Sequence, residues 1–362
     1  MSDVLLSADS HVVEPPVVFD TYLRGLWTAD RPRLGDDGAG GQCYRIPGST
    51  RVVGLGLAGA AGADDADLQE VGTRFADIRP GAWLPDARLA DQDVDGVAGE
   101  VLYPTIGLFL IDHPDRAFAT ACLTAYNRWL ADFCSYAPSR LIGCGASAAN
   151  SAEDLTDDVT GVRATGLRGV LLPLASPGEP YSSPAFDRAW ATAADLRIPV
   201  SFHALPPRRR LPALGPASAV VQPVWEAQEL LTELIFGGVL HRSPGIRFVF
   251  AEFDAGWVPH FVQRLDHHFH RNYRWLRLDS AMDRPPSHYV RESVHFTFED
   301  DEFALSVLPR DGMNVLWGND FPHAESTWPH SRRVAARAAA SLPRDEYRAA
   351  FGDRLCNLYR IR

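Results

Sequence analysis

Short apolar runs alternate with amphipathic stretches along most of the chain. Each run is apolar and often β-branched, which is typical of a strand buried on both faces of a parallel sheet. The stretches between the runs carry apolar residues at helical spacing. The runs cover Val4–Ala8, Glu100–Tyr103, Leu141–Ala146, Gly169–Leu172, Val200–His203, Arg247–Glu252, Val294–Phe298 and Val315–Asp320. The helical stretches cover Arg116–Tyr136, Ala152–Thr165, Pro184–Leu196, Trp225–Leu240, Trp257–Leu276, Glu302–Leu308 and Ser331–Leu342.

Eight strands that alternate with helices predict an α/β fold, a (β/α)8 TIM barrel that uses residues 1–362 as one domain. A doubly wound sheet is the alternative, but no GxGxxG motif follows the first strand. Residues 25–85 interrupt the alternation and are rich in Gly, Pro and Asp. We expect them to form an insertion after strand one that folds over the barrel mouth and can act as a lid.

Composition narrows the classes of function. The formal net charge is −11, so the chain lacks the basic surface needed to bind nucleic acid or anionic membrane. It has neither a long apolar run nor a signal peptide at its start, and its five cysteines show no CxxC spacing. These features predict a cytoplasmic protein with reduced thiols. All 35 basic residues are arginine, which excludes a Schiff base and a carbamylated lysine.

Metal-ligand residue types stand at the carboxyl ends of four predicted strands, where TIM barrels place their reacting groups. Asp9 and His11 end strand one, and side chains two apart on a strand share a face. His203, Glu252 and Asp320 end strands five, six and eight. A single such residue is usually a loop hydrogen bonder, but burying all of them together is costly without a cation. The pattern therefore predicts a metal centre.

Several motifs resemble the amidohydrolase-related TIM-barrel family. They are ADSHVVEPP (Ala8–Pro16), VLYPT (Val101–Thr105), VSFH (Val200–His203), FAEFDAGWVP (Phe250–Pro259) and LWGNDFPHAESTWP (Leu316–Pro329). That family includes metal-dependent hydrolases and nonoxidative decarboxylases. The resemblance covers nearly the whole chain except residues 25–85, and it implies that the metal ligands are Asp9, His11, His203 and Asp320.

Glu252 departs from the family pattern, because the decarboxylases usually have a proton-donating histidine on strand six. A carboxylate is a poor proton donor at neutral pH unless its pKa is strongly raised. It is, however, a good oxygen ligand and a candidate bridge between two ions. Glu14 and His323 stand close in sequence to the ligand positions and extend the set of candidates to seven. Seven N/O groups suit two octahedral ions such as iron or manganese.

This carboxylate-rich set resembles a branch of nonheme diiron monooxygenases that includes the hydroxylase of platensimycin and platencin biosynthesis. The resemblance implies two Fe ions, O2 as cosubstrate, an external electron donor and a CoA-linked, terpenoid-like substrate in antibiotic biosynthesis. Barrels of the family often dimerise, which makes a homodimer an expectation. Three arginines after His203, namely Arg208, Arg209 and Arg210, could bind the phosphates of CoA. The alternative for them is a solvated basic loop.

The leading hypothesis is therefore a diiron monooxygenase in which Glu252, Asp320 and His203 are catalytic. The expected substrate is a small-molecule acyl-CoA or acid. The alternative function is a zinc- or manganese-dependent amidohydrolase-type hydrolase or nonoxidative decarboxylase. A third hypothesis is a nonenzymatic ligand-binding barrel that retains its metal as a scaffold.

Overall fold

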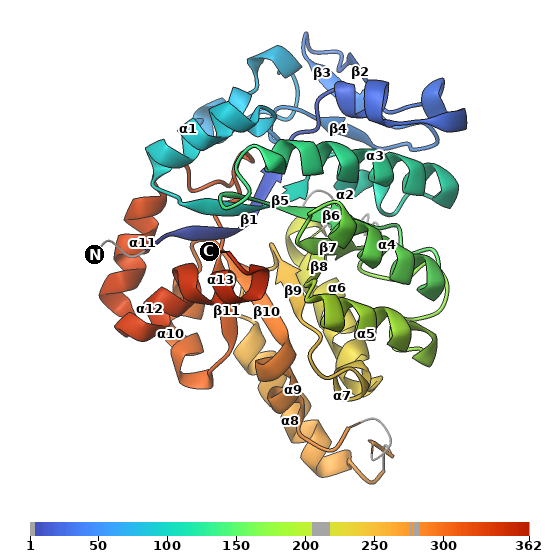
Figure 1. The fold of residues 1–362 in the computed structure, drawn as a ribbon. Coiled ribbons are helices and arrows are strands. Elements are labelled where there is room, and N and C mark those ends of the chain that lie inside the picture. The colour runs from blue at the N-terminus through green and yellow to red at the C-terminus, as the bar shows by residue number, and fades with distance from the viewer. Residues whose placement is uncertain (1–3, 205–217, 276, 279–281, 362) are drawn as a thin grey trace.

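A computed structural model describes residues 4–204, 218–275, 277–278 and 282–361. Eight parallel strands follow one another in chain order around a nearly closed barrel (Figure 1). The backbone N–H of Asp320 donates to Asp9 O at 2.9 Å, which ties the loop after the last strand to the first strand. The predicted TIM barrel is confirmed. Its strands are β1 (Leu6–Val12), β5 (Gly99–Pro104), β6 (Leu141–Ala146), β7 (Gly169–Leu172), β8 (Val200–His203), β9 (Phe248–Ala251), β10 (Val294–Phe298) and β11 (Asn314–Trp317).

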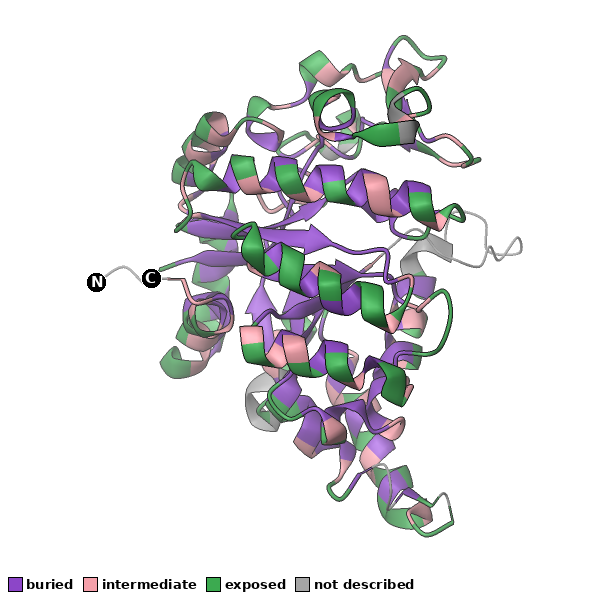
Figure 2. Ribbon diagram, turned by 45° about the vertical axis from the view of Figure 1, so that its right-hand side comes forward, coloured by how far each residue is buried: buried purple, intermediate pink, exposed green. Residues whose placement is uncertain are grey.

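Helices surround the strands, and along each helix buried residues alternate with residues exposed to solvent (Figure 2). The main helices are α1 (Pro85–Asp95), α3 (Arg116–Ser135), α4 (Ala152–Ala164), α5 (Asp187–Leu196), α6 (Ser218–Phe236), α8 (Val258–Asn272), α9 (Pro286–Ser293), α10 (Glu302–Asp311) and α11 (Ser331–Ser341). Shorter helices are α2 (Gly107–Leu110), α7 (Val239–Arg242), α12 (Arg344–Arg348) and α13 (Arg354–Tyr359). This arrangement explains the alternation of apolar runs and amphipathic stretches.

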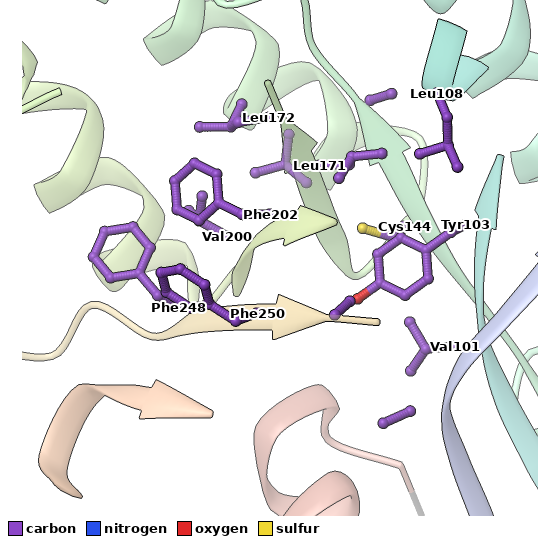
Figure 3. Packing of buried hydrophobic residues seen from close by; sticks show 14 of the residues in the cluster. Val101, Tyr103, Leu108, Cys144, Leu171, Leu172, Val200, Phe202, Phe248 and Phe250 are labelled. Atoms are coloured by element: carbon purple, nitrogen blue, oxygen red, sulfur yellow. The ribbon is translucent and has the colours of Figure 1, made fainter. Parts of the chain in front are cut away.

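The core between strands and helices is rich in aromatic side chains. Phe202 on β8 lies beside Phe248 and Phe250 on β9 (Figure 3), with ring centroids 5.7 Å apart in both pairs. Phe248 also meets Trp190 of α5 edge-on at 5.5 Å. Each fully buried side chain of this kind stabilises the fold by about 1.5–3 kcal/mol. These contacts fix β8 and β9, whose carboxyl ends point toward the barrel mouth.

The insertion after β1 contains a three-stranded antiparallel sheet of β2 (Arg33–Asp36), β3 (Gln42–Arg45) and β4 (Val52–Gly54). Its glycine-rich segment is bonded to the loop after β11: Ala61 N donates to Pro322 O, and Ala324 N donates to Leu57 O, both at 2.9 Å. A Cβ at Gly62 would lie 2.6 Å from the Trp328 ring, so this contact requires glycine. The insertion therefore packs directly on that loop, and a role as a lid stays a prediction.

Two strand ends differ from the predicted ones. The first strand extends to Val12, whose ladder partner is Pro104, so Asp9 and His11 lie inside β1. The last strand ends at Trp317, and Asp320 lies in the following loop with φ +48°. The polar residues Asp9, Ser10 and His11 resemble the start of a loop, so the sequence pattern ended the first strand too early. The apolar run before Asp320 resembles a longer strand, so the pattern ended the last strand too late.

Candidate metal centre

Five acidic and imidazole side chains from four strand ends meet at the barrel mouth. The structure brings Asp9 and His11 from β1 together with His203 at the end of β8, Glu252 just after β9 and Asp320 in the loop after β11. Four of them are at most 2% exposed, whereas Glu252 is 28% exposed. Glu252 also has φ +62°, which turns the chain sharply as it leaves the strand.

The facing atoms of these side chains lie within a few ångströms of one another. His203 Nε2 is 3.1 Å from His11 Nε2, 3.3 Å from Asp9 Oδ1 and 3.2 Å from Glu252 Oε2. His11 Nε2 is 3.6 Å from Glu252 Oε2 and 3.4 Å from Asp320 Oδ1. Nitrogen and oxygen atoms at such spacing, contributed by different elements, can ligate a shared divalent cation.

Both buried histidines present an inward ring nitrogen that is free to ligate. His11 Nδ1 lies 3.0 Å from Pro104 O, and His203 Nδ1 lies 2.7 Å from Ala204 O. A carbonyl oxygen only accepts, so each Nδ1 carries the proton and each Nε2 offers its lone pair. Asp9 Oδ1 and Asp320 Oδ1 are buried without a hydrogen-bond donor among the described residues. Buried bare acceptors are costly, and a cation at this point would satisfy them. The donor set therefore fits a divalent metal ion.

His323 joins this group from the loop after β11. Its Nδ1 lies 3.0 Å from Asp320 Oδ1, and its ring centroid is 4.0 Å from that of His11. Asp320 Oδ1 nevertheless accepts no hydrogen bond from any residue that the structure describes. His323 Nδ1 and Asp320 Oδ1 are close enough to ligate the same cation.

Glu14 is not brought into the group. Its two carboxylate oxygens accept hydrogen bonds from three consecutive backbone N–H groups, those of Thr105, Ile106 and Gly107, at 2.8–3.1 Å. Burial raises its pKa to about 7, partly offset by these N–H groups. The backbone N–H groups of the loop after β5 thus bind both oxygens of Glu14, which the sequence pattern predicted to be a metal ligand. Arg208, Arg209 and Arg210 lie outside the described residues, so their predicted role in substrate binding stays a prediction.

Thr297 on β10 belongs to the site although the sequence pattern does not mark it. Its hydroxyl donates to Asp9 Oδ2 at 2.9 Å and accepts the backbone N–H of Glu252 at 2.8 Å. Thr297 therefore occupies Asp9 Oδ2 with a hydrogen bond, whereas Asp9 Oδ1 stays available to a cation. A threonine in a strand is too common to signal such a role.

A pocket of about 270 Å³ opens beside the centre, and its wall is strongly acidic. Glu252 and Thr297 belong to both the centre and the pocket wall. Among the residues described, the pocket lining includes no basic side chain; it consists of Glu252, Asp254, Thr297, Phe298, Glu299, Asp300 and Glu325. Burial, and next the charges of Asp320 and Glu252, raise the pKa of Glu299 well above its ordinary value.

Protons balance the charge of the centre when no cation is bound. Burial, and next the negative charges of Asp320 and Asp9, raise the pKa of Glu252 to about 8, against the opposing effect of His203. Burial lowers the pKa of His203, but the charges of Glu252 and Asp9 outweigh it and raise the value to about 9. Burial and the two neighbouring imidazoles keep the pKa of His11 well below its ordinary value. A cation would have to displace several of these protons.

The metal-free protein is expected to lose stability as pH rises from 6 to 9. Glu252 ionises near 8 in the folded state against an ordinary value of 4.5, and His203 near 9 against 6.5. The folded state therefore holds more protons than the unfolded state in this interval, so the free energy of unfolding falls with rising pH. Thermal unfolding in EDTA should show a falling Tm, and Mn²⁺ should raise Tm more at pH 8.5 than at pH 6. A Tm in EDTA that rises over this interval would contradict the assignment.

The family model described as amidohydrolase matches residues 65–353, which is most of the chain. The chain belongs to the amidohydrolase family. The resemblance seen in the motifs is thereby confirmed. The family match includes the segments that carry His203, Glu252 and Asp320, while Asp9 and His11 precede it.

Several proteins that are similar to this chain are named as decarboxylases. It is 24% identical over 257 residues to the 2-amino-3-carboxymuconate-6-semialdehyde decarboxylase of Dictyostelium discoideum, covering 69% of this chain and 70% of the relative. Among solved structures, it resembles an amidohydrolase from Mycobacterium avium subsp. paratuberculosis K-10, with TM-score 0.80, 21% identity and coverage of 99% and 100%. It also resembles the 5-carboxyvanillate decarboxylase of Novosphingobium aromaticivorans DSM 12444, with TM-score 0.70, 17% identity and coverage of 99% and 97%. That enzyme was solved with bound manganese and a nitrobenzoic acid.

These relatives overturn the leading hypothesis. The prediction of a diiron monooxygenase, an oxidoreductase with two Fe ions, O2 and an electron donor in antibiotic biosynthesis, is wrong, because the Dictyostelium relative and the 5-carboxyvanillate enzyme are decarboxylases and the latter holds manganese. The error lies in the resemblance to diiron monooxygenases: carboxylates and imidazoles bind iron and manganese alike, so a carboxylate-rich ligand set does not identify the reaction. The relatives favour the alternative, a metal-dependent decarboxylase of a small acid.

A bilayer-spanning segment was not expected from the sequence. Over the described part of the chain, no helix combines the length and apolar character that crossing a membrane requires.

Proposed function

We propose that this protein is a metal-dependent, nonoxidative decarboxylase of a small unsaturated or aromatic carboxylic acid. The observation that carries the proposal is the convergence of bare ligand atoms from four strand ends beside an open pocket. The names of the relatives support the reaction type. Manganese is the first candidate for the cation, and zinc is the second.

Asp9, His11, His203 and Asp320 would hold the cation, as the resemblance to the family implies. His323 has an atom close enough to complete the shell. A bound divalent cation would act as a Lewis acid on the substrate oxygens. The hydrogen bonds of Thr297 and the strand ladders hold the ligand side chains in place. These side chains would in turn fix the position of the substrate acid relative to the pocket.

Glu252 is the residue that would handle the proton. Loss of CO2 breaks the bond between the carboxylate and the substrate carbon and leaves the electron pair on that carbon, which must then receive a proton. Glu252 faces the pocket and stands where family decarboxylases usually have histidine. Its carboxylic acid would give up the proton to carbon and regain one from solvent through its exposed face.

The acidic wall makes binding of an acid depend on the cation. Asp254 and Glu325 face the same pocket as Glu252, and their charges repel an incoming carboxylate. A divalent cation beside Glu252 would reverse the local field. Removal of the metal should therefore abolish substrate binding as well as turnover.

A hydrolase is the competing reaction class, because the family model is described as amidohydrolase. The same side chains could place a water molecule instead of a carboxylate. The two classes differ in product: a decarboxylase releases CO2, whereas a hydrolase adds water to its substrate and releases none.

The test is an anaerobic assay of CO2 release with protein stripped by EDTA and reloaded with Mn²⁺ or Zn²⁺. Substrates would be 5-carboxyvanillate, 2,6-dihydroxybenzoate and related benzoates. We expect CO2 release that requires the metal and is unchanged by O2. Binding of these acids without CO2 release, or turnover that consumes O2, would refute the proposal.

Three further expectations stay predictions alongside this function. They are that residues 1–362 act as a single domain with 25–85 as an insertion or lid, that the chain forms a homodimer, and that an acyl-CoA is accepted through the arginines after His203. The last of these gains nothing from the relatives, whose names describe small acids without CoA.

A further inference from the structure

Thr105, in the turn between β5 and α2, contacts the ring of His323 across the barrel mouth. Its Oγ1 lies 3.0 Å from His323 Nε2, and the residue is buried. Thr105 immediately follows Pro104, whose carbonyl oxygen lies 3.0 Å from Nδ1 of His11. Two neighbouring residues of one turn therefore contact the outer nitrogens of two imidazoles.

The three imidazoles of the centre share one arrangement. His11 and His203 each use the outer nitrogen for a backbone carbonyl, which leaves the inner nitrogen for the cation. His323 uses its outer nitrogen for the Thr105 hydroxyl, and its inner Nδ1 faces Asp320 without a hydrogen bond that the described residues provide. With a cation bound through Nδ1, the Nε2–H of His323 would donate to Thr105 Oγ1, because the ring then carries its proton on Nε2.

The turn that carries Thr105 is anchored to β1. The backbone N–H of Thr105 donates to Glu14 Oε2 at 3.1 Å and to Val12 O at 3.1 Å. Glu14 Oε1 accepts the N–H of Gly107 at 2.8 Å. Glu14 thus holds the turn in register with the strand that supplies Asp9 and His11.

The His323 side chain depends on this contact more than the other imidazoles do. Backbone bonds of Pro322 and Ala324 to the insertion fix the main chain on both sides of it. The ring itself is 17% exposed, whereas His11 and His203 are fully buried. Main-chain anchoring does not fix the side-chain torsions, so an additional contact is needed to hold the ring.

We infer that Thr105 is a positioning residue that orients His323 so that Nδ1 faces the cation, and that Glu14 anchors Thr105 for this task. The inference rests on the metal centre of the proposed function. It gives a role to the one predicted ligand, Glu14, that the structure keeps away from the centre.

The test compares the Mn²⁺ affinity of three EDTA-stripped proteins: the wild type, Thr105→Val and Thr105→Ser. The EPR signal of free Mn²⁺ measures the binding. Valine keeps the shape of threonine without the hydroxyl, and serine keeps the hydroxyl. We expect Thr105→Val to weaken binding by about 10- to 100-fold, the usual cost of losing a partner of a ligating histidine, and Thr105→Ser to stay close to wild type. Thermal unfolding in EDTA checks that each variant folds.

A double-mutant cycle with His323→Ala separates positioning from general damage. If Thr105 acts through His323, Thr105→Val should add little to the loss already caused by His323→Ala. Equal losses in both backgrounds, or wild-type affinity of Thr105→Val, would overturn the inference. A wild-type protein that binds no Mn²⁺ would instead refute the proposed function, so the two failures are distinguishable.

Discussion

The His203→Ala protein is expected to lose high-affinity Mn²⁺ binding and to turn over about a thousandfold more slowly or worse. His203 Nε2 lies within 3.3 Å of atoms from His11, Asp9 and Glu252, so it faces three of the other candidate ligands. Its removal deletes one nitrogen donor and leaves the facing carboxylates to repel each other. Metal content of protein grown with added manganese and CO2 release at saturating substrate measure the two effects.

His288→Ala is the matched control for this variant. His288 is 41% exposed on α9 and pairs with Glu292 on the same helix, away from the mouth. We expect this variant to retain metal and activity. If His203→Ala keeps a full complement of manganese and wild-type turnover, the assignment of the metal centre fails.

Glu252→Gln is expected to retain the metal and to lose turnover by about 10²- to 10⁴-fold, the range for a missing general acid. Glutamine has nearly the same shape as glutamate but cannot transfer a carboxyl proton. The remaining candidate ligands Asp9, His11, His203 and Asp320 are unchanged, so Mn²⁺ affinity should fall much less than turnover. The fall should appear in kcat rather than in the affinity for a substrate analogue such as a nitrobenzoic acid.

Two comparisons sharpen this prediction. Asp254→Asn and Glu325→Gln remove other charges from the same pocket wall and should leave most of kcat intact. Glu252→His introduces the residue that family decarboxylases usually have at this position. We expect its kcat to exceed that of Glu252→Gln by at least about tenfold. Wild-type kcat in Glu252→Gln, or equal losses in all pocket variants, would show that Glu252 has no special role.

The reaction class was the part of the function that residue patterns alone misjudged. The sequence shows which atoms can ligate metal, but the same oxygen and nitrogen donors serve oxygen activation, hydrolysis and decarboxylation. Glu252 was interpreted as a bridge because it replaces a histidine. In the structure it is the most exposed member of the group and lines the pocket, which suits a residue that meets substrate.

The amino-acid sequence by itself determined the barrel and the place of the site. Apolar runs of strand length that alternate with amphipathic helices can bury their surfaces as a (β/α)8 barrel, and the carboxyl ends of parallel strands necessarily meet at one mouth. Asp9, His11, His203, Glu252 and Asp320 could therefore be grouped without coordinates. Their order along the chain and their residue types were sufficient for that prediction.

Only the tertiary structure decided which neighbouring groups take part. Glu14 is three residues from His11 in sequence, yet three backbone N–H groups of the β5–α2 turn bind its carboxylate. Thr105 and Thr297 come from distant strands and become partners of His323 and Asp9 through contacts that no spacing encodes. The physical reason is that hydrogen bonds depend on separations of about 3 Å and on direction, and folding sets both only when all the elements have packed.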